Sequence, residues 1–238
     1  MNIKTTTLAR IDALILCGGL GTRLRPLIAD RPKGLAEVAG KPLLDILVVE
    51  LLQQGCRRII FCVGHMKEQI IAHYLGRNDA KFLFAEEEVP LGTGGAVRNA
   101  LPLVQSDPFL ILNGDSLCRV DLEQFLAFHH SHGASASLVL ADAGDRHDGG
   151  VVRLDAGFRI SQFVEKPSGA LPPDSFINAG IYLMQKQSAN AGPRQSRYSL
   201  ESEVFPALVA EGHCYGFPVA GGVVDIGTPE RYRQANQP

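Results

Sequence analysis

The chain has 238 residues, of which 45% are hydrophobic and 20% are charged, so it can form a packed globular core and is not disordered as a whole. Lys and Arg number 23 against 25 Asp and Glu, a formal net charge of −2, which argues against a protein that binds nucleic acid broadly along its phosphates. The length suits one large α/β domain, and no linker divides it, so we predict a single domain over residues 1–238.

The cysteines and the N-terminus bear on the cellular compartment. The cysteines are odd in number and lack the spacing of a zinc site: Cys17, Cys56, Cys62, Cys118 and Cys214. We interpret them as buried thiols in a reducing environment. The first apolar run, residues 11–16, is too short for a signal peptide or a membrane span. We therefore expect a cytoplasmic protein with neither a membrane nor a nucleic acid as its partner.

The first half of the chain alternates apolar strands with helices. After a loose segment over residues 1–10, we expect strands at 11–17, 58–63, 81–85 and 109–112, and helices at 41–54, 67–75 and 93–104. This alternation favours a parallel sheet with helices on both faces. Ligands of such sheets bind at the carboxyl ends of the strands.

The second half, from about residue 116 to 235, is less regular. We expect strands at 135–141, 150–154, 159–165, 176–184, 214–218 and 222–225, helices at 122–130, 200–210 and from about 229, and exposed loops at 144–150 and 167–173. The whole pattern predicts an α/β fold with a mixed, mainly parallel sheet flanked by helices.

The loop after the first strand is rich in glycine. Gly18, Gly19 and Gly21 let backbone N–H groups approach a phosphate, and Arg23 adds a fixed positive charge. The spacing matches neither G-x-G-x-x-G nor a Walker loop, so a dinucleotide oxidoreductase is a weaker interpretation. Taken alone, the loop is equally typical of a structural turn. Lys33 is a candidate for a second phosphate, with a solvated turn as the alternative.

A second glycine cluster, residues 90–96, opens the helix expected at 93–104 and follows three consecutive glutamates. Glycines here can expose backbone N–H and C=O groups, which can form hydrogen bonds with the edge of a purine or pyrimidine base. The alternative is a helix start that needs small residues only for packing.

Candidate metal ligands and sugar-binding residues follow later strands. Asp115 and Asp225 each end an apolar strand, where a carboxylate can hold Mg²⁺; a turn residue or a helix cap is the alternative. Glu165, Lys166 and Asn178 suit a sugar phosphate, with an ion pair and a strand bulge as the alternative. Since no Ser–His–Asp or Cys–His arrangement is present, the set favours in-line displacement at phosphorus.

Three histidines, His129, His130 and His132, lie near the end of the helix expected at 122–130. No carboxylate or cysteine stands at ligand spacing beside them, so we interpret them as a solvated helix end and not as a metal site.

In combination, these segments resemble the sugar-1-phosphate nucleotidylyltransferase family. The matching motifs stand in the family's order: L-C-G-G-L-G-T-R-L-R-P at 16–26, R-P-K at 31–33, P-L-G-T-G-G-A at 90–96, N-G-D at 113–115, E-K-P at 165–167, N-A-G at 178–180 and D-I-G-T-P at 225–229. The likeness covers about residues 11–235. It implies a Rossmann-like, GT-A-like fold and the reaction NTP + sugar 1-phosphate → NDP-sugar + pyrophosphate.

The resemblance also implies a role for each matching residue. The implied nucleotide site comprises Leu16, Gly18, Gly19, Gly21, Thr22, Arg23, Lys33, Glu87, Pro90, Gly92, Thr93 and Gly94. The implied sugar-phosphate site comprises Asn113, Gly114, Glu165, Lys166, Asn178 and Gly180. Asp115 and Asp225 would bind Mg²⁺, and the catalytic set is Arg23, Lys33, Asp115, Lys166 and Asp225. The nucleotide half would run over about 11–115 and the sugar-phosphate half over about 116–235.

Within the family, the likeness is greatest to guanylyltransferases that use GTP and D-glycero-α-D-manno-heptose 1-phosphate. Mannose-1-phosphate guanylyltransferases and N-acetylmuramate- or hexose-1-phosphate uridylyltransferases are the alternatives. A heptose would imply assembly of a bacterial surface glycan, such as lipopolysaccharide, capsule or S-layer glycan. We expect small-molecule substrates and a monomer or homodimer. Larger relatives carry a C-terminal β-helix that this sequence lacks, so we do not expect a bifunctional enzyme.

One departure from the family pattern concerns Gly34, which stands where a second proline follows the lysine in most members. We expect it to loosen the loop behind Lys33. It is also the one feature that supports an alternative of another class, a catalytically silent paralogue that binds a nucleotide-sugar and regulates a partner.

Overall fold

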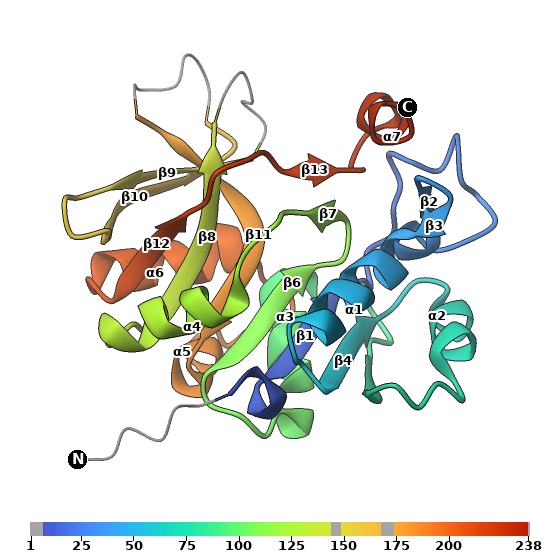
Figure 1. Cartoon of the computed structure of the whole chain (residues 1–238), viewed down its shortest axis with the longest axis horizontal. Coiled ribbons are helices and arrows are strands. Elements are labelled where there is room, and N and C mark those ends of the chain that lie inside the picture. Colours follow the sequence, from blue (N-terminus) through green and yellow to red (C-terminus); the bar gives the residue numbers. More distant parts are fainter. Residues whose placement is uncertain (1–6, 144–148, 168–173, 238) are drawn as a thin grey trace.

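The computed structural model describes residues 7–143, 149–167 and 174–237. The loops expected at 144–150 and 167–173 therefore lie largely outside the described residues. Within these ranges, a nine-stranded mixed sheet forms the centre of the molecule, with strands in the order β10-β9-β11-β6-β1-β4-β5, with β8 paired to β11 and with β12 paired to β8 (Figure 1).

The first half builds the parallel part of the sheet. Its strands and helices are β1 (Asp12–Leu16), α1 (Leu43–Gln53), β4 (Arg58–Val63), α2 (Lys67–Tyr74), β5 (Lys81–Glu86), α3 (Gly92–Ala100) and β6 (Phe109–Asn113). Strand β1 pairs in parallel with both β4 and β6, and β4 pairs in parallel with β5. The predicted alternation of strand and helix is therefore confirmed.

Short elements adjust the predicted bounds. Helix α1 begins later than expected because β3 (Lys41–Pro42) pairs with β2 (Glu37–Val38). The helix expected at 93–104 is divided into α3 and the 3₁₀ turn η3 (Leu101–Leu103). The segment expected to be loose includes a 3₁₀ turn, η1 (Leu8–Arg10).

The second half adds antiparallel strands. Its elements are α4 (Leu122–Ser131), β8 (Ala136–Asp142), β9 (Gly150–Leu154), β10 (Ile160–Glu165), β11 (Phe176–Met184), α5 (Lys186–Asn190), η4 (Leu200–Val204), α6 (Phe205–Ala210), β12 (Cys214–Pro218) and α7 (Pro229–Ala235). Strand β11 pairs antiparallel with β6, β8 and β9, so one sheet runs through both halves. The predicted helix at 200–210 consists of a π-helical turn, η4, followed by α6.

Helix α5 and the two-residue strands β2, β3 and β7 were not predicted. The expected strand at 222–225 is only β13 (Val224–Asp225), and its partner β7 (Ser116–Leu117) was not expected. The two strands form a separate antiparallel ribbon.

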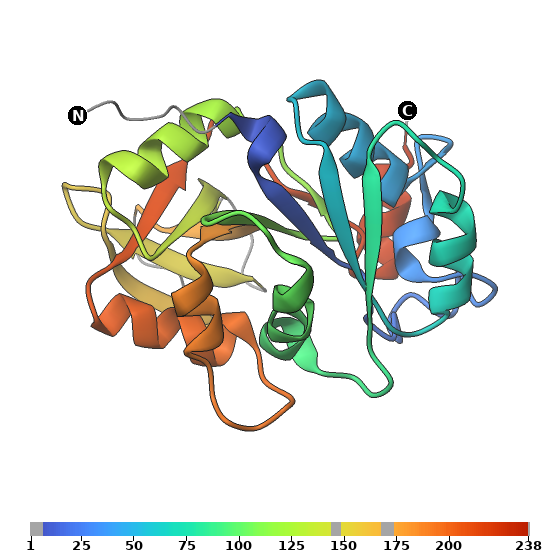
Figure 2. The same cartoon turned by 90° about the horizontal axis from the view of Figure 1, so that it is seen from below.

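Two helical layers cover the faces of the sheet (Figure 2). Along β1, Ala13 and Ile15 point to one face and Leu14 to the other, and all three are fully buried. Helices α1, α2 and α4 pack on the first face, and α3, α5 and α6 pack on the second. Because both faces are covered, the central strands are continuous apolar runs and not alternating ones.

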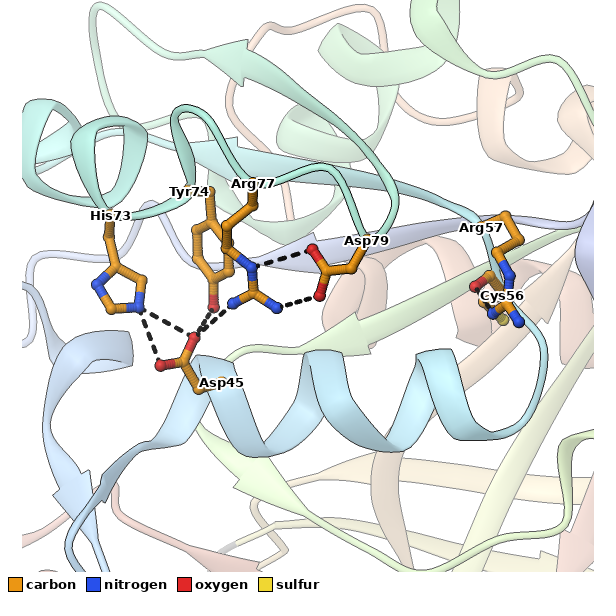
Figure 3. A network of polar contacts seen from close by, with 7 residues as sticks. All are labelled: Asp45, Cys56, Arg57, His73, Tyr74, Arg77 and Asp79. Carbon is orange, nitrogen blue, oxygen red and sulfur yellow. Dashed lines mark hydrogen bonds and ion pairs between the residues drawn. The ribbon is translucent and has the colours of Figure 1, made fainter.

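Helix α1 is held at both ends by polar contacts, those of its first turn being drawn in Figure 3. In its first turn, the Asp45 carboxylate accepts hydrogen bonds from the Tyr74 hydroxyl at 2.9 Å and from Arg77 at 3.2 Å, and it lies 3.0 Å from Nε2 of His73. At its other end, Arg57 donates to the carbonyl oxygen of Leu52, in the last turn of α1, and to that of Cys56, both at 2.8 Å. These contacts fix α1 against α2 and hold its first turn in place.

The cysteines are all buried and unpaired, as expected. In the part of the chain that the structure describes, no helix has the length and apolar character needed to cross a membrane.

Candidate active site

A cleft of about 420 Å³ opens beyond the carboxyl ends of β1, β5 and β6. The cleft is lined by the glycine loop, by the start of α3 and by the turn after β6. The sequence-predicted residues that line it are Leu16, Gly18, Gly19, Gly21, Thr22, Arg23, Lys33, Glu87, Pro90, Gly92, Thr93, Asn113, Gly114 and Asp115. The cleft lies at the carboxyl end of a parallel sheet, as predicted, because β1 pairs in parallel with β4 and β6.

The glycine loop is anchored by one apolar side chain. The N–H groups of Leu24 and Arg25 both donate to the carbonyl oxygen of Gly21, at 2.9 and 3.2 Å, and close a tight turn. Leu24 is 1% exposed and packs in a small core with Leu43 and Ile226. The turn therefore holds its backbone in place while the exposed Arg23 lines the cleft.

Lys33 reaches the cleft from a 3₁₀ turn, η2 (Lys33–Leu35), and its Nζ lies 2.7 Å from Oδ2 of Asp115. The loosening expected at Gly34 stays a prediction, and the structure gives the glycine another role, since it is buried inside this turn. A Cβ at that position would lie 2.8 Å from Cγ and Cδ1 of Leu44, in the first turn of α1. The missing side chain therefore makes room for Leu44, and the glycine does not displace Lys33.

The two candidate metal ligands come together through the β7–β13 ribbon. Asp225 stands opposite Ser116, and the N–H of Ile226 donates to the carbonyl oxygen of Asp115 at 3.0 Å. The Asp225 carboxylate accepts two hydrogen bonds from Nη1 of Arg231, at 2.9 and 3.1 Å. It also accepts the N–H of Gly227 at 2.8 Å.

Gly227 marks the point where the charged groups of the cleft converge. A Cβ added there would lie 2.9 Å from Oδ1 of Asp225, 3.6 Å from Nη2 of Arg23 and 3.8 Å from Nζ of Lys33. Two carboxylates from neighbouring backbone segments offer the hard oxygen ligands that Mg²⁺ prefers, and Mg²⁺ commonly completes its shell with water and substrate phosphates. The donor set therefore fits this ion. Among the residues that the structure describes, His, Cys, Asp and Glu form no group of three or more suited to a metal.

At the start of α3, packing accounts for three glycines of the second cluster: a Cβ would overlap the carbonyl oxygen of Tyr198 at Gly92, the ring of Tyr198 at Gly94 and the carbonyl oxygen of Ser196 at Gly95. Gly92 and Thr93 line the cleft, whereas Gly94 does not. A Cβ on Gly94 would overlap the ring of Tyr198, so no larger residue fits there. Of the two interpretations of this cluster, packing explains Gly94 directly, and its contact with the base stays a prediction.

Glu87 is a half-buried carboxylate at the same end of the cleft. Its Oε2 accepts the N–H of Leu91 at 3.1 Å. Burial raises the pKa of Glu87, and the Leu91 hydrogen bond opposes this shift. The Glu87 carboxylate is therefore easier to protonate than an exposed glutamate. Protonation would reduce its capacity to accept hydrogen bonds from a ligand.

The predicted sugar-phosphate residues of the second half do not line this cleft, and of these residues Gly180 contacts one that does, Asn113. Gly180 packs on Asn113, since a Cβ at Gly180 would lie 2.8 Å from Nδ2 of Asn113. A Cβ at Gly150 would contact Oε2 of Glu165 at 3.0 Å and Cβ of Asn178 at 3.4 Å, which places these two side chains near each other. Lys166 has a φ of 51°, a left-handed backbone conformation that is costly for a lysine and often found at functional sites.

Sequence reasoning missed Arg197 and Arg231. Arg197 lines the cleft from the segment before η4, beside the start of α3. The N–H of the next residue, Tyr198, donates to the carbonyl oxygen of Leu91 at 3.0 Å, which ties the two segments together. No sequence motif singles out either arginine. The fold brings Arg197 to the cleft and Arg231 to Asp225.

The interpretation of His129 was wrong. It is 2% exposed, and its Nδ1 lies 2.9 Å from the hydroxyl of Ser137. Burial, helped by the neighbouring His130, lowers the pKa of His129 to about 4. This histidine is a neutral core residue and not part of a solvated helix end.

A glycine-rich loop, a convergent set of cationic side chains and paired carboxylates at the end of a parallel sheet define a Rossmann-like nucleotide-binding α/β protein. A family model described as "Nucleotidyl transferase" matches residues 12–238. The chain belongs to the nucleotidyl transferase family. Membership excludes the dinucleotide oxidoreductase that the glycine loop left as a weaker interpretation.

Curated relatives are named for one activity. Mannose-1-phosphate guanylyltransferase of Mycobacterium tuberculosis is 37% identical over 94% of this chain and 63% of its own length. The catalytic subunit beta of mannose-1-phosphate guanylyltransferase of Drosophila melanogaster is 35% identical over 92% of this chain and 60% of its own length. The chain thus spans less than two thirds of each of these relatives.

Solved structures show the same fold. HddC from Yersinia pseudotuberculosis, complexed with GMP-PN, is 31% identical with a TM-score of 0.80, over 94% of this chain and 97% of that one. A putative glucose-1-phosphate thymidylyltransferase from Bacillus anthracis has a TM-score of 0.84 at 21% identity, over 95% of this chain and 94% of that one. The predicted Rossmann-like fold of nucleotide-sugar transferases is confirmed.

Proposed function

We propose that this protein transfers a guanylyl group from GTP to a manno-configured sugar 1-phosphate and releases pyrophosphate. The observation that carries the proposal is the convergence of Arg23, Lys33 and Asp225 on Gly227, with Asp115 paired to Lys33, at the end of a cleft built by a nucleotidyl transferase fold. In-line displacement at phosphorus depends mainly on positioning and charge neutralisation, which this arrangement supplies.

In the proposed reaction, an oxygen of the sugar 1-phosphate attacks the α-phosphorus of GTP. The new P–O bond forms as the bond to the β-phosphate oxygen breaks, and the electron pair leaves with pyrophosphate. Arg23 would hold the β- and γ-phosphates, Lys33 would neutralise charge at the α-phosphate, and Lys166 would hold the incoming phosphate. Mg²⁺ held by Asp115 and Asp225 would add positive charge to the phosphates.

The choice of guanine rests on two side chains that flank Leu91. Its N–H donates to Glu87 at 3.1 Å, and its carbonyl oxygen accepts the N–H of Tyr198 at 3.0 Å, next to Arg197. Both Glu87 and Arg197 line the cleft. Guanine presents N–H donors on one edge and the acceptors O6 and N7 on another, so a carboxylate and a guanidinium together suit it. Adenine presents a different pattern.

For the sugar, D-glycero-α-D-manno-heptose 1-phosphate is the first candidate and mannose 1-phosphate the second. The motif resemblance favours the heptose, and the match to HddC covers nearly the whole of both chains. The curated relatives named mannose-1-phosphate guanylyltransferase favour mannose. We propose the cytoplasm as the site of action, since the unpaired cysteines suit a reducing compartment.

The test is pyrophosphate release with Mg²⁺ across GTP, ATP, UTP, CTP and dTTP, each against the manno-heptose, mannose, glucose and N-acetylmuramate 1-phosphates. We expect turnover with GTP and one of the two manno-configured phosphates. Turnover with UTP instead would overturn the assignment of Glu87 and Arg197 to guanine. A folded protein that binds nucleotide-sugar tightly but gives no turnover would support the regulatory paralogue.

A further inference from the structure

Glu201 lies outside the cleft, yet it contacts residues of both proposed subsites. It belongs to the π-helical turn η4, and such turns occur often at functional sites. Its Oε2 accepts the hydroxyl of Thr93 at 2.6 Å and the hydroxyl of Ser199 at 2.7 Å. Its Oε1 lies 3.4 Å from the hydroxyl of Tyr182, in β11. One carboxylate thus spans the space between α3 and β11.

The Thr93 hydroxyl is fully engaged within the protein. It donates to Glu201 and accepts the N–H of Leu200 at 2.9 Å. A hydroxyl has one hydrogen to donate, and this one is directed at the carboxylate. Thr93 therefore lines the cleft with its backbone and methyl group. The position of both groups depends on the hydrogen bond between the Thr93 hydroxyl and Glu201.

On the other side, the hydrogen bonds continue to Asn178. A carboxylate only accepts, so Tyr182 donates to Glu201, and the Tyr182 oxygen accepts the amide N–H of Asn178 at 2.8 Å. The amide oxygen of Asn178 in turn accepts the N–H of Gly180 at 3.0 Å. The Gly180 N–H and the Tyr182 oxygen together hold the Asn178 amide in one orientation, and Glu201 accepts at the far end of this chain of hydrogen bonds.

We infer that Glu201 is a positioning residue that orients Thr93 at the nucleotide and Asn178 at the sugar phosphate at the same time. The inference rests on the proposed function, which assigns these two residues to the two substrates. Hydrogen bonds to an ionised acceptor are stronger than neutral ones, and a half-buried network gains further from the low dielectric. A glutamine cannot reproduce this set, because its NH₂ group donates where a hydroxyl must also donate.

The same turn offers a matched control. Glu203 accepts the N–H of Ser199 at 2.8 Å and the side-chain amide of Gln195 at 2.7 Å, and none of its hydrogen bonds reaches Thr93, Tyr182 or Asn178. Glu203→Gln removes a carboxylate from η4 without changing the contacts of either subsite. A merely structural role for Glu201 would make the two variants behave alike.

The experiment compares the wild type with Glu201→Gln, Glu203→Gln and Tyr182→Phe. Tm, kcat and the KM of each substrate are measured by pyrophosphate release, and GTP affinity is measured by calorimetry. We expect Glu201→Gln to raise both KM values and to lower kcat by about 10- to 100-fold, the scale of a small misplacement of reacting groups. Glu203→Gln should keep wild-type kinetics at a similar Tm.

Tyr182→Phe tests the hydrogen bonds to Asn178 separately from those to Thr93, and phenylalanine has nearly the same shape as tyrosine. It breaks the path to Asn178 and keeps the contact of Glu201 with Thr93, so only the KM of the sugar 1-phosphate should rise. Wild-type kinetics in Glu201→Gln, or the same kinetic change in Glu203→Gln, would overturn the inference.

Failure of the proposed function has a different signature. If the wild type transfers no guanylyl group to any sugar 1-phosphate, that function is wrong, and calorimetry then decides on Glu201. Weaker GTP binding in Glu201→Gln but not in Glu203→Gln would still support its action on Thr93. Equal affinity in both variants would overturn it.

Discussion

Lys33 and Asp115, 82 positions apart in the chain, form an ion pair in the cleft, with Nζ 2.7 Å from Oδ2. Each belongs to the predicted catalytic set, and each neutralises the other in this structure. We propose that a bound nucleotide replaces this pair: Lys33 turns to the α-phosphate, and the Asp115 carboxylate becomes a ligand of Mg²⁺. The same logic applies to Asp225, which Arg231 neutralises at 2.9 Å.

The first prediction concerns the two carboxylates. Asp115→Asn and Asp225→Asn should each lower kcat by about 10²- to 10⁴-fold, because an amide is a much weaker ligand for Mg²⁺ and loses the charge that neutralises the cations. Both variants should need more Mg²⁺ for half-maximal rate. A Mg²⁺ titration of pyrophosphate release measures this, with Asp79→Asn, an ion-paired aspartate that does not line the cleft, as the control. Near-wild-type turnover in both variants would contradict the metal assignment.

The second prediction concerns Arg197. Arg197→Ala should raise the KM for GTP by about 10- to 100-fold, the loss of one charge-assisted hydrogen bond, and should leave the KM of the sugar 1-phosphate unchanged. Arg194→Ala is the matched control, since Arg194 is exposed in the same segment and does not line the cleft. If both variants bind GTP like the wild type, Arg197 takes no part in holding the nucleotide.

The third prediction concerns Gly34. Gly34→Ala should cost about 1–3 kcal/mol of unfolding free energy, because its Cβ would overlap Leu44 in a packed core. It should also lower kcat, since Lys33 is the preceding residue. Gly222→Ala, where an added Cβ meets nothing within 4 Å, should leave stability unchanged. The double variant Gly34→Ala/Leu44→Ala should be less destabilised than the sum of its parts. Strict additivity in urea unfolding would show that the two sites do not conflict.

The fourth prediction is a pH dependence of stability. In the unfolded chain His129 titrates near 6.5, whereas its pKa in the fold is about 4, so the unfolded state binds more protons between these values. Its contribution is therefore present above pH 6.5 and is lost as the pH falls. The buried Nε2 of His129 has no hydrogen-bond partner among the residues that the structure describes, so a proton there would lack an acceptor in this part of the chain.

The measurement is urea unfolding of the wild type, His129→Gln and His130→Gln at pH 7 and pH 4.5. The wild type should lose about 2 kcal/mol more than His129→Gln over this range. His130→Gln, a change at an exposed neighbour, should follow the wild type. Parallel pH profiles for the wild type and His129→Gln would rule out His129 as the titrating group.

The sequence by itself determined the strands of the main sheet, the helices of the first half and the position of the glycine loop. Apolar period and turn chemistry are local, so the run at 11–17 could only be a buried strand leading into a loop beside Gly18. The motifs around Lys33, Asp115 and Asp225 likewise stand in the order that the family resemblance requires. Short elements could not be predicted in this way, because α5, β7 and the π-helical turn have too few residues to show a periodic pattern of apolar side chains.

The tertiary structure decided which of these residues meet. Asp225 reaches the end of β6 only because strands of two residues each, β7 and β13, pair although they lie more than 100 positions apart in the chain. It also decided that Gly94 faces the ring of Tyr198, that Gly34 makes room for Leu44, and that Arg197 enters the cleft. Such contacts depend on side chains distant in sequence that share one small volume. They leave no periodic trace in the sequence, so only the packed fold reveals them.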